Sequence, residues 1–225
     1  MEKNRIISSI VCNSLIILIV AFSVSCYFLH IFTIAPNSVN FRCFRYFTTD
    51  SNIFVALTSI FLIVYDVKML RNLNYQLPNW VIKLKFVATV AVSVTFLVVL
   101  FYLAPIGGFA KLYYGPSFFL HLVVPVLAIV SCVFYDFPIA LSTKACFLGV
   151  IPMAVYSIVY FTMVIIVGEA NGGWEDFYHF NEGGLYLVSL FAMYLATFTL
   201  CYVFNVIRNR AITGPSESVK LKVNS

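Results

Sequence analysis

The amino-acid sequence predicts an all-α membrane protein, a polytopic bundle of six transmembrane helices. Of the 225 residues, 62% are hydrophobic and only 10% are charged, whereas soluble domains carry about 25% charged residues. A helix needs about 20 mostly apolar residues to cross the hydrocarbon core of a bilayer. Six stretches meet that need, at residues 6–34, 52–70, 80–105, 117–137, 146–168 and 185–207. Their apolar runs are continuous, which favours helices over the alternating strands of a membrane β-barrel.

The six stretches and the short connections between them leave no segment for a soluble domain. Residues 1–210 are therefore predicted to form one transmembrane domain and residues 211–225 a cytoplasmic tail. The connections between the stretches are too short to enclose a hydrophobic core of their own. The first stretch follows Lys3 and Arg5 as a signal peptide would, but it exceeds the roughly 7–15 apolar residues of such a segment. It is expected to remain as the first span.

The lysines and arginines predict the orientation of the bundle. With six spans, both termini and the second–third and fourth–fifth connections share one side of the membrane. That side holds Lys3, Arg5, Lys68, Arg71, Lys83, Lys85, Lys144, Arg208, Arg210, Lys220 and Lys222, and the other side holds Arg42, Arg45 and Lys111. Because positive residues concentrate on the cytoplasmic side, both termini of this multi-pass cell-membrane protein are predicted to be cytoplasmic. Topology and contact with anionic membrane lipids then explain the net charge of +5, and no nucleic-acid partner is expected.

The sequence lacks the signatures of the common metal and cofactor sites. It contains no HExxH helix, no GxSxG elbow, no Walker lysine loop and no GxGxxG turn. The three histidines have no helical spacing and the six cysteines form no CxxC pair, so neither a metal nor a cofactor is predicted. A disulfide between Cys26 and Cys43, which both approach the outer side, remains open.

Charged residues are costly within lipid, so their positions are informative. Asp66, Lys68 and Asp136 lie at the predicted cytoplasmic ends of the second and fourth spans, where an interfacial position explains them. The outer loop, residues 170–184, is rich in glycine and acidic residues. It is expected to be mobile and dispensable for folding, with its aromatic residues resting at the level of the lipid headgroups.

Five polar residues open the second span: Thr48, Thr49, Asp50, Ser51 and Asn52. A helix needs an N-cap, and Asp50 or Thr49 is predicted to supply it, which leaves Thr48 unexplained.

A second polar residue stands out at the same predicted side of the membrane. His121 lies in the apolar segment SFFLHLVVPVL, one turn inside the fourth span. Pro125 lacks the amide that would bond to the carbonyl of His121, so the helix is expected to be loosened there. A histidine in this position is either a functional residue or a buried side chain with one satisfied hydrogen bond, and the sequence leaves both interpretations open.

The segment RYFT before the second span, together with the lone histidine and VVP of HLVVP, resembles the androgen-induced protein family of membrane proteins. That family includes the androgen-dependent regulator of tissue factor pathway inhibitor and has microbial relatives. The segment TTDSN that begins at Thr48 is similar to the sequence of the microbial relatives. Animal members are intramembrane threonine hydrolases of fatty-acid esters of hydroxy fatty acids. The resemblance implies that Thr48 is the nucleophile and His121 the base. Animal members carry small and polar residues around that histidine, where this chain has Phe118, Phe119, Leu120, Leu122 and Val123.

The implied chemistry is consistent with the residue types. A threonine hydroxyl attacks an ester only when a base takes its proton, and a neutral histidine can do so near pH 7. Ser51, Asn52 or first-turn amides could stabilise the oxyanion, and Asp50 could orient the histidine if it is not the cap. We expect Thr48 and His121 to share one cavity that opens toward the extracytoplasmic leaflet and admits a lipid ester.

The alternative function is a non-catalytic membrane protein that uses the same polar cluster, such as a small transporter, a sensor or a partner-binding subunit. Transporters usually carry inverted repeats, and no two halves of this sequence align. The sequence does not specify a protein partner.

Overall fold

The computed structural model describes residues 2–32, 40–136 and 141–221, with the backbone alone for 212–221. Within these ranges the chain is all-α, as predicted, and six helices are long and apolar enough to span a membrane. They run over Glu2–Leu29, Phe47–Arg71, Asn79–Gly107, Pro116–Phe134, Ala145–Val167 and Tyr186–Ala211. Each overlaps one predicted span, and residues 33–34 and 137, at the ends of two predicted spans, lie outside the described ranges. The prediction of six membrane-length helices is confirmed.

The elements of the spans are as follows. The first two spans are α1 (Glu2–Leu29) and α2 (Phe47–Arg71), and the third joins α3 (Asn79–Val98), η3 (Val99–Leu103) and α4 (Ala104–Gly107). The fourth joins α6 (Pro116–Phe118), η4 (Phe119–Val123) and α7 (Val124–Phe134), and the fifth joins α8 (Ala145–Gly149), α9 (Ile151–Phe161) and η5 (Thr162–Val167). The last helix, α10 (Tyr186–Leu221), continues past the sixth span into the segment predicted as a tail.

Short helical turns occupy the connections at the end of the bundle opposite the termini. They are η2 (Asn40–Arg45), α5 (Phe109–Leu112), η6 (Glu169–Asn171) and η7 (Glu182–Gly184).

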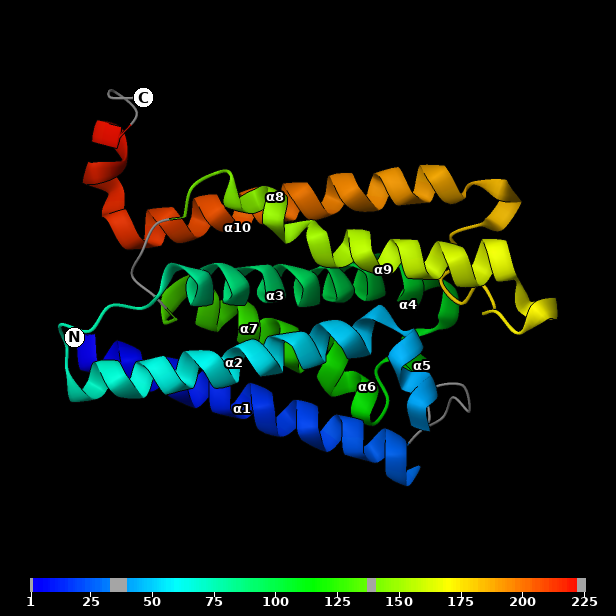
Figure 1. Cartoon of the computed structure of the whole chain (residues 1–225), viewed down its shortest axis with the longest axis horizontal. Coiled ribbons are helices and arrows are strands. Elements are labelled where there is room, and N and C mark those ends of the chain that lie inside the picture. The colour runs from blue at the N-terminus through cyan, green and yellow to red at the C-terminus, as the bar shows by residue number, and fades with distance from the viewer. Residues whose placement is uncertain (1, 33–39, 137–140, 222–225) are drawn as a thin grey trace.

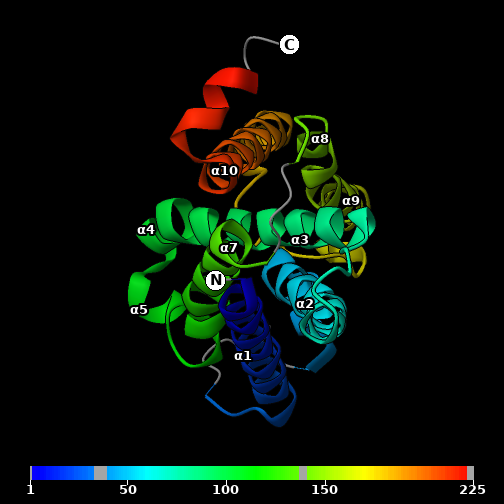
Figure 2. The same cartoon turned by 90° about the vertical axis from the view of Figure 1, so that its left-hand side faces the viewer.

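The spans run side by side along the long axis, and both ends of the chain lie at the same end of the bundle (Figure 1). Seen along that axis, α3 lies between α1 and α2 on one side and α8, α9 and α10 on the other (Figure 2). Accordingly, 61% of the most apolar window of the third span is buried, against 11% for the sixth. The third span is therefore the centre of the bundle.

The distribution of polarity is that of a protein surrounded by lipid. Large apolar side chains such as Leu18, Ile158 and Leu187 are exposed, whereas Asn13 and Ser59 are fully buried. Polar side chains that face the bundle interior and bond across helices are typical of membrane helices. The chain is an integral membrane protein.

Three spans change to π-helical geometry near the end opposite the termini, at η3, η4 and η5. In η4 the amide of Val124 bonds to the carbonyl of Phe119, five residues back. Pro125 cannot donate to the carbonyl of His121, so the predicted loosening at this histidine is present in the form of a π turn. Such turns recur at functional sites.

The start of α2 corrects one prediction. The helix begins at Phe47 rather than at residue 52, and its N-cap residue, Tyr46, makes no side-chain cap bond. The prediction that Asp50 or Thr49 caps the helix is therefore wrong. The Phe47 amide instead donates to the Tyr178 hydroxyl oxygen over 2.9 Å, so the outer loop satisfies a first-turn donor that a local cap usually satisfies.

The outer loop corrects a second prediction, because it is packed into the bundle. Tyr178 and Phe180 are only 7% and 9% exposed and belong to the hydrophobic core. Asp176 accepts hydrogen bonds from the Tyr160 hydroxyl and from two loop amides. Burial raises the pKa of the Tyr178 phenol above its ordinary value, so its hydroxyl stays neutral at physiological pH. The loop is part of the folded core rather than a solvated connection.

The end of the bundle that carries the termini corrects a third prediction. Asp66 and Asp136, predicted as interfacial charges, are both 0% exposed, and so is Lys85. They lie among other polar side chains between the helices instead of in headgroup water. Toward the end opposite the termini, Cys26 and Cys43 are both free thiols.

Candidate functional site

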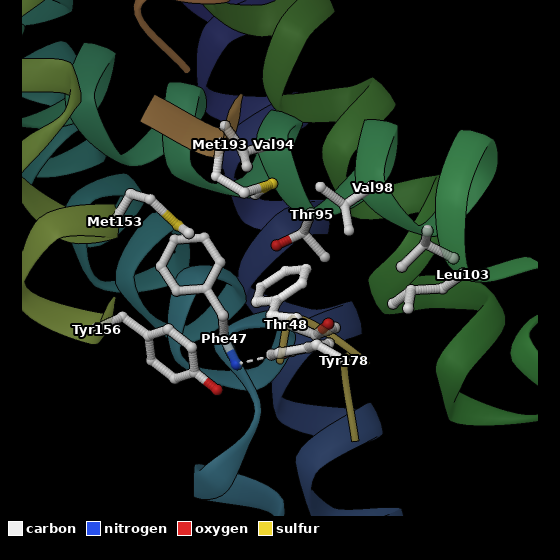
Figure 3. A pocket seen from close by; sticks show the side chains of 12 residues that line it. Phe47, Thr48, Val94, Thr95, Val98, Leu103, Met153, Tyr156, Tyr178 and Met193 are labelled. Carbon is white, nitrogen blue, oxygen red and sulfur yellow. Dashed lines mark hydrogen bonds between the residues drawn. The ribbon is translucent and has the colours of Figure 1, made fainter. Parts of the chain in front are cut away.

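Thr48 lies in the first turn of α2 and lines a small internal cavity of about 20 Å³ (Figure 3). The cavity wall also includes Thr95 of α3 and Tyr178 of the outer loop, with Met153 and Met193 on further helices. A single water molecule needs roughly 10–15 Å³ of such space, so the cavity has room for about one.

The hydroxyl of Thr48 is the distinctive feature of this cavity. Among the described residues it has no hydrogen-bond partner, although Thr48 is only 8% exposed. Ser51, Thr58 and Ser59 of the same helix donate their hydroxyl protons to backbone carbonyls, which is the usual arrangement within a helix. Thr48 is thus a largely buried hydroxyl that no local bond engages.

The two neighbouring candidates, Ser51 and Asn52, form hydrogen bonds between the elements that surround the site. Ser51 bonds to the Thr48 carbonyl over 3.1 Å and to the Thr95 hydroxyl over 3.0 Å. Asn52 is fully buried, and its amide nitrogen lies 2.7 Å from the Thr48 carbonyl and 3.1 Å from the Leu120 carbonyl. Asn52 therefore joins the first turn of α2 to the π turn η4, next to His121.

His121 is buried in η4, as the sequence predicts for an ionisable residue in a membrane helix. Its Nδ1 lies 2.6 Å from the Leu112 carbonyl oxygen, and the Tyr113 ring meets the imidazole edge-on. Because a carbonyl can only accept, Nδ1 carries the proton and Nε2 keeps its lone pair in the neutral ring. This tautomer leaves Nε2 able to act as a base.

The structure places the two predicted catalytic residues on neighbouring elements, α2 and η4, which Asn52 joins through its bonds to the Thr48 and Leu120 carbonyls. Their side chains are not joined: no hydrogen bond links the Thr48 hydroxyl to His121 within the described ranges, and His121 is not among the residues lining the cavity of Thr48.

A groove of about 650 Å³ lies beside this cavity. Its walls come from α2, α3, α8 and α9 and are largely apolar, with Asp50, Ser51, Lys83, Trp80 and Trp174 among the lining residues. Phe47 and Tyr156 line both the groove and the small cavity, and their ring centroids are 5.1 Å apart. These two rings form the partition between the two spaces.

Some residues of the site carried no signal in the sequence. Thr95 lies in the third span after Thr89 and Ser93, and nothing in the sequence sets it apart from them. Tyr178 lies in a loop whose aromatic residues suggested a headgroup belt. In contrast, Ser9 and Asn13 stand four residues apart in α1, which places them on one helix face. That spacing was a usable sign of a polar cluster at the other end of the bundle.

Among the described residues, no group of three or more His, Cys, Asp or Glu side chains could hold a metal ion. No protein-family model, no curated protein and no solved structure matches the chain.

Proposed function

We propose that the protein is an intramembrane hydrolase of lipid esters in which Thr48 is the nucleophile and His121 the general base. The observation that carries the proposal is the unengaged hydroxyl of Thr48, which faces an internal cavity at the mouth of a membrane helix. The sequence resemblance to the androgen-induced protein family supports the same two residues.

The groove supports a lipid as the substrate. Its volume falls within the roughly 300–1,000 Å³ of ligand sites, and its walls are apolar along most of their length. An acyl chain in the groove would bring its ester end to the side of α2 that carries Asp50 and Ser51. Rotation of Phe47 or Tyr156 would then open the partition and admit the ester carbonyl to Thr48.

The base and the oxyanion donor follow from the hydrogen bonds that are already made. Nε2 of His121 is free to accept the Thr48 proton once substrate binding draws the two side chains together, since catalytic pairs often tighten only in the complex. The amides of Phe47, Thr49 and Asp50 are engaged. The amide of Thr48 has no partner among the described residues, so it is the first-turn donor best placed to stabilise the oxyanion.

Labelling with a fluorophosphonate probe tests this proposal. We expect purified wild-type protein in detergent to be labelled covalently, Thr48→Ala to give no labelling, and His121→Gln to label about 10²–10⁴-fold more slowly. Thr58→Ala is the matched control, because Thr58 is also buried in α2 but bonds to the Val55 carbonyl. Labelling of Thr48→Ala at the wild-type rate would remove Thr48 as the nucleophile. A folded wild type that neither labels nor hydrolyses any lipid ester would favour a non-catalytic lipid-binding protein.

We also propose that both termini are cytoplasmic, which places Trp174 at the outer end of the groove and Trp80 and Lys83 at its cytoplasmic end. Lys144 and Glu175 are exposed at opposite ends of the bundle. In intact cells, a membrane-impermeant maleimide is expected to label Glu175→Cys, and to label Lys144→Cys only after permeabilisation, above the background of the unsubstituted protein. Labelling of both positions from one side would contradict the six-span topology, and the reverse pattern would invert the orientation.

A further inference from the structure

A second polar site lies at the end of the bundle that carries the termini, where α1, α2 and α7 meet (Figure 2). Its side chains are fully buried and come from three parts of the chain: Ser9, Asn13, Asp66, Ser131 and Asp136. Two carboxyl groups thus share an interior that neither water nor headgroups reach. The proposed hydrolase uses none of these residues.

The Ser9 hydroxyl stands between the two carboxyl groups. Its oxygen lies 2.6 Å from Asp66 Oδ2 and 3.2 Å from Asp136 Oδ1. A serine hydroxyl has one proton, so it can donate to only one of two ionised carboxylates. If both were ionised, one of them would lack this donor, and an unpaired charge in the bundle interior is very costly.

The two carboxyl groups differ in their other contacts. Asp136 Oδ1 also receives the Asn13 amide over 2.9 Å and the Ser131 hydroxyl. Asp66 Oδ2 has Ser9 as its hydrogen-bond partner, and the second oxygen of each carboxyl group is buried without a partner among the described residues. The donors that converge on Asp136 favour its ionised form, whereas a single donor reaches Asp66 and would stabilise its anion less.

The basic groups around the site do not neutralise Asp66 directly. Within the described side chains, neither Lys85 nor Arg5 forms an ion pair with Asp66. Lys85 of α3 bonds to the Ser59 hydroxyl over 2.7 Å, and Arg5 of α1 donates to the Tyr135 carbonyl. The remaining titratable neighbours are Arg208 of α10, Cys12 of α1 and Cys132 of α7. Lys85 acts on both carboxyl groups at longer range, Arg5 acts on Asp66, and Arg208 acts on Asp136.

We propose that Asp66 is a proton-binding site in the interior of the bundle. The protonated Asp66 donates from Oδ2 to Ser9 Oγ, and Ser9 donates its own proton to the ionised Asp136. One added proton thereby completes a chain of hydrogen bonds that joins α2, α1 and the end of α7. Loss of that proton leaves two carboxylates competing for one serine, and their repulsion loosens the contact of α1 with α2 and α7. The site therefore couples protonation to the packing of these helices.

The sign of the pH dependence of stability follows from the binding of this proton to Asp66. An unfolded aspartate loses its proton above a pH of about 3.9, whereas the proposed chain of hydrogen bonds in the folded protein includes a proton on Asp66. The folded state then binds one more proton than the unfolded state, so stability falls as the pH rises from about 4.

Infrared spectra and thermal unfolding of the purified full-length protein test the assignment. We expect the wild type to show the carbonyl stretch of a protonated carboxyl group at neutral pH, and Asp66→Asn to lack that band. The asparagine amide can still donate to Ser9, so Asp66→Asn should fold, and it should unfold near the wild-type temperature. Its unfolding should release one proton fewer than that of the wild type, as measured from the pH dependence of unfolding.

Asp136→Asn is the matched control at the other carboxyl group. It should unfold at a clearly lower temperature, because the donors Ser131 and Asn13 lose their anion, and it should lose the band at a lower pH than the wild type, because Ser9 is then free to donate to an ionised Asp66. If Asp136→Asn does not fold, the comparison of wild type with Asp66→Asn still decides whether Asp66 carries the proton. Absence of the band in wild type, or its persistence in Asp66→Asn, would overturn the proposal.

Discussion

Replacing Asp176 by alanine should lower the free energy of unfolding by about 3 kcal/mol and reduce the amount of folded protein in the membrane. Asp176 lies in the outer loop, where one oxygen accepts the Tyr160 hydroxyl over 2.7 Å and the Phe180 amide over 3.0 Å. Its other oxygen accepts the Asn181 amide over 2.7 Å. Alanine removes an acceptor shared by three donors, of which the Tyr160 hydroxyl belongs to a fully packed side chain.

The effect should extend from the loop to α2. Tyr160 also accepts the amide of Tyr178 over 3.2 Å, and the Tyr178 hydroxyl in turn accepts the Phe47 amide. Loss of Asp176 therefore weakens the contact that satisfies the first turn of α2, beside Thr48. We expect Asp176→Ala to unfold at a lower temperature and to label more slowly with the fluorophosphonate probe.

Glu182→Ala provides the control for this prediction. Glu182 is an acidic residue of the same loop that pairs with His179 on the exposed surface, where an ion pair contributes about 0–1 kcal/mol. The Glu182→Ala variant should unfold within a degree or two of the wild-type temperature. Equal unfolding temperatures for Asp176→Ala and the wild type would show that the loop is dispensable after all.

The loop also shows where prediction from the sequence stops. The six spans could be predicted because each is a continuous apolar run, and the bilayer alone fixes the length of such a run. The role of residues 170–184 could not, because Tyr178 and Phe180 look the same whether they rest at headgroups or pack inward. Only their contacts with α2 and α9 distinguish the two arrangements.

The same limit applies to the polar residues. The sequence marked Thr48, Asn52 and His121, because polar groups at a membrane helix require an explanation. It could not pair Asp66 with Asp136, which are far apart in the chain, since only the packing of α1 between α2 and α7 brings them to Ser9. It also assigned the helix cap locally, whereas a distant tyrosine provides the acceptor. Each error concerns a contact between segments rather than the identity of a segment.

Asn52 gives the second large expected effect. Asn52→Leu keeps a side chain of similar size but removes the amide that reaches the Thr48 and Leu120 carbonyls. The Leu120 carbonyl, within a π turn beside Pro125, then loses a buried donor, which costs about 1–3 kcal/mol. The π turn is released from α2, and His121 moves with it.

A shift of about 1 Å between catalytic groups can reduce a rate 10²-fold. If Thr48 and His121 act together, Asn52→Leu should therefore reduce fluorophosphonate labelling by about 10²-fold, more than its loss of stability explains. Thr58→Ala is the matched variant, because it removes a buried hydroxyl of α2 that bonds to the Val55 carbonyl without touching η4. It should lower the unfolding temperature slightly and retain most of the labelling. If the two variants lose labelling in proportion to stability, Asn52 is only structural, and the alignment of His121 with Thr48 does not depend on this link.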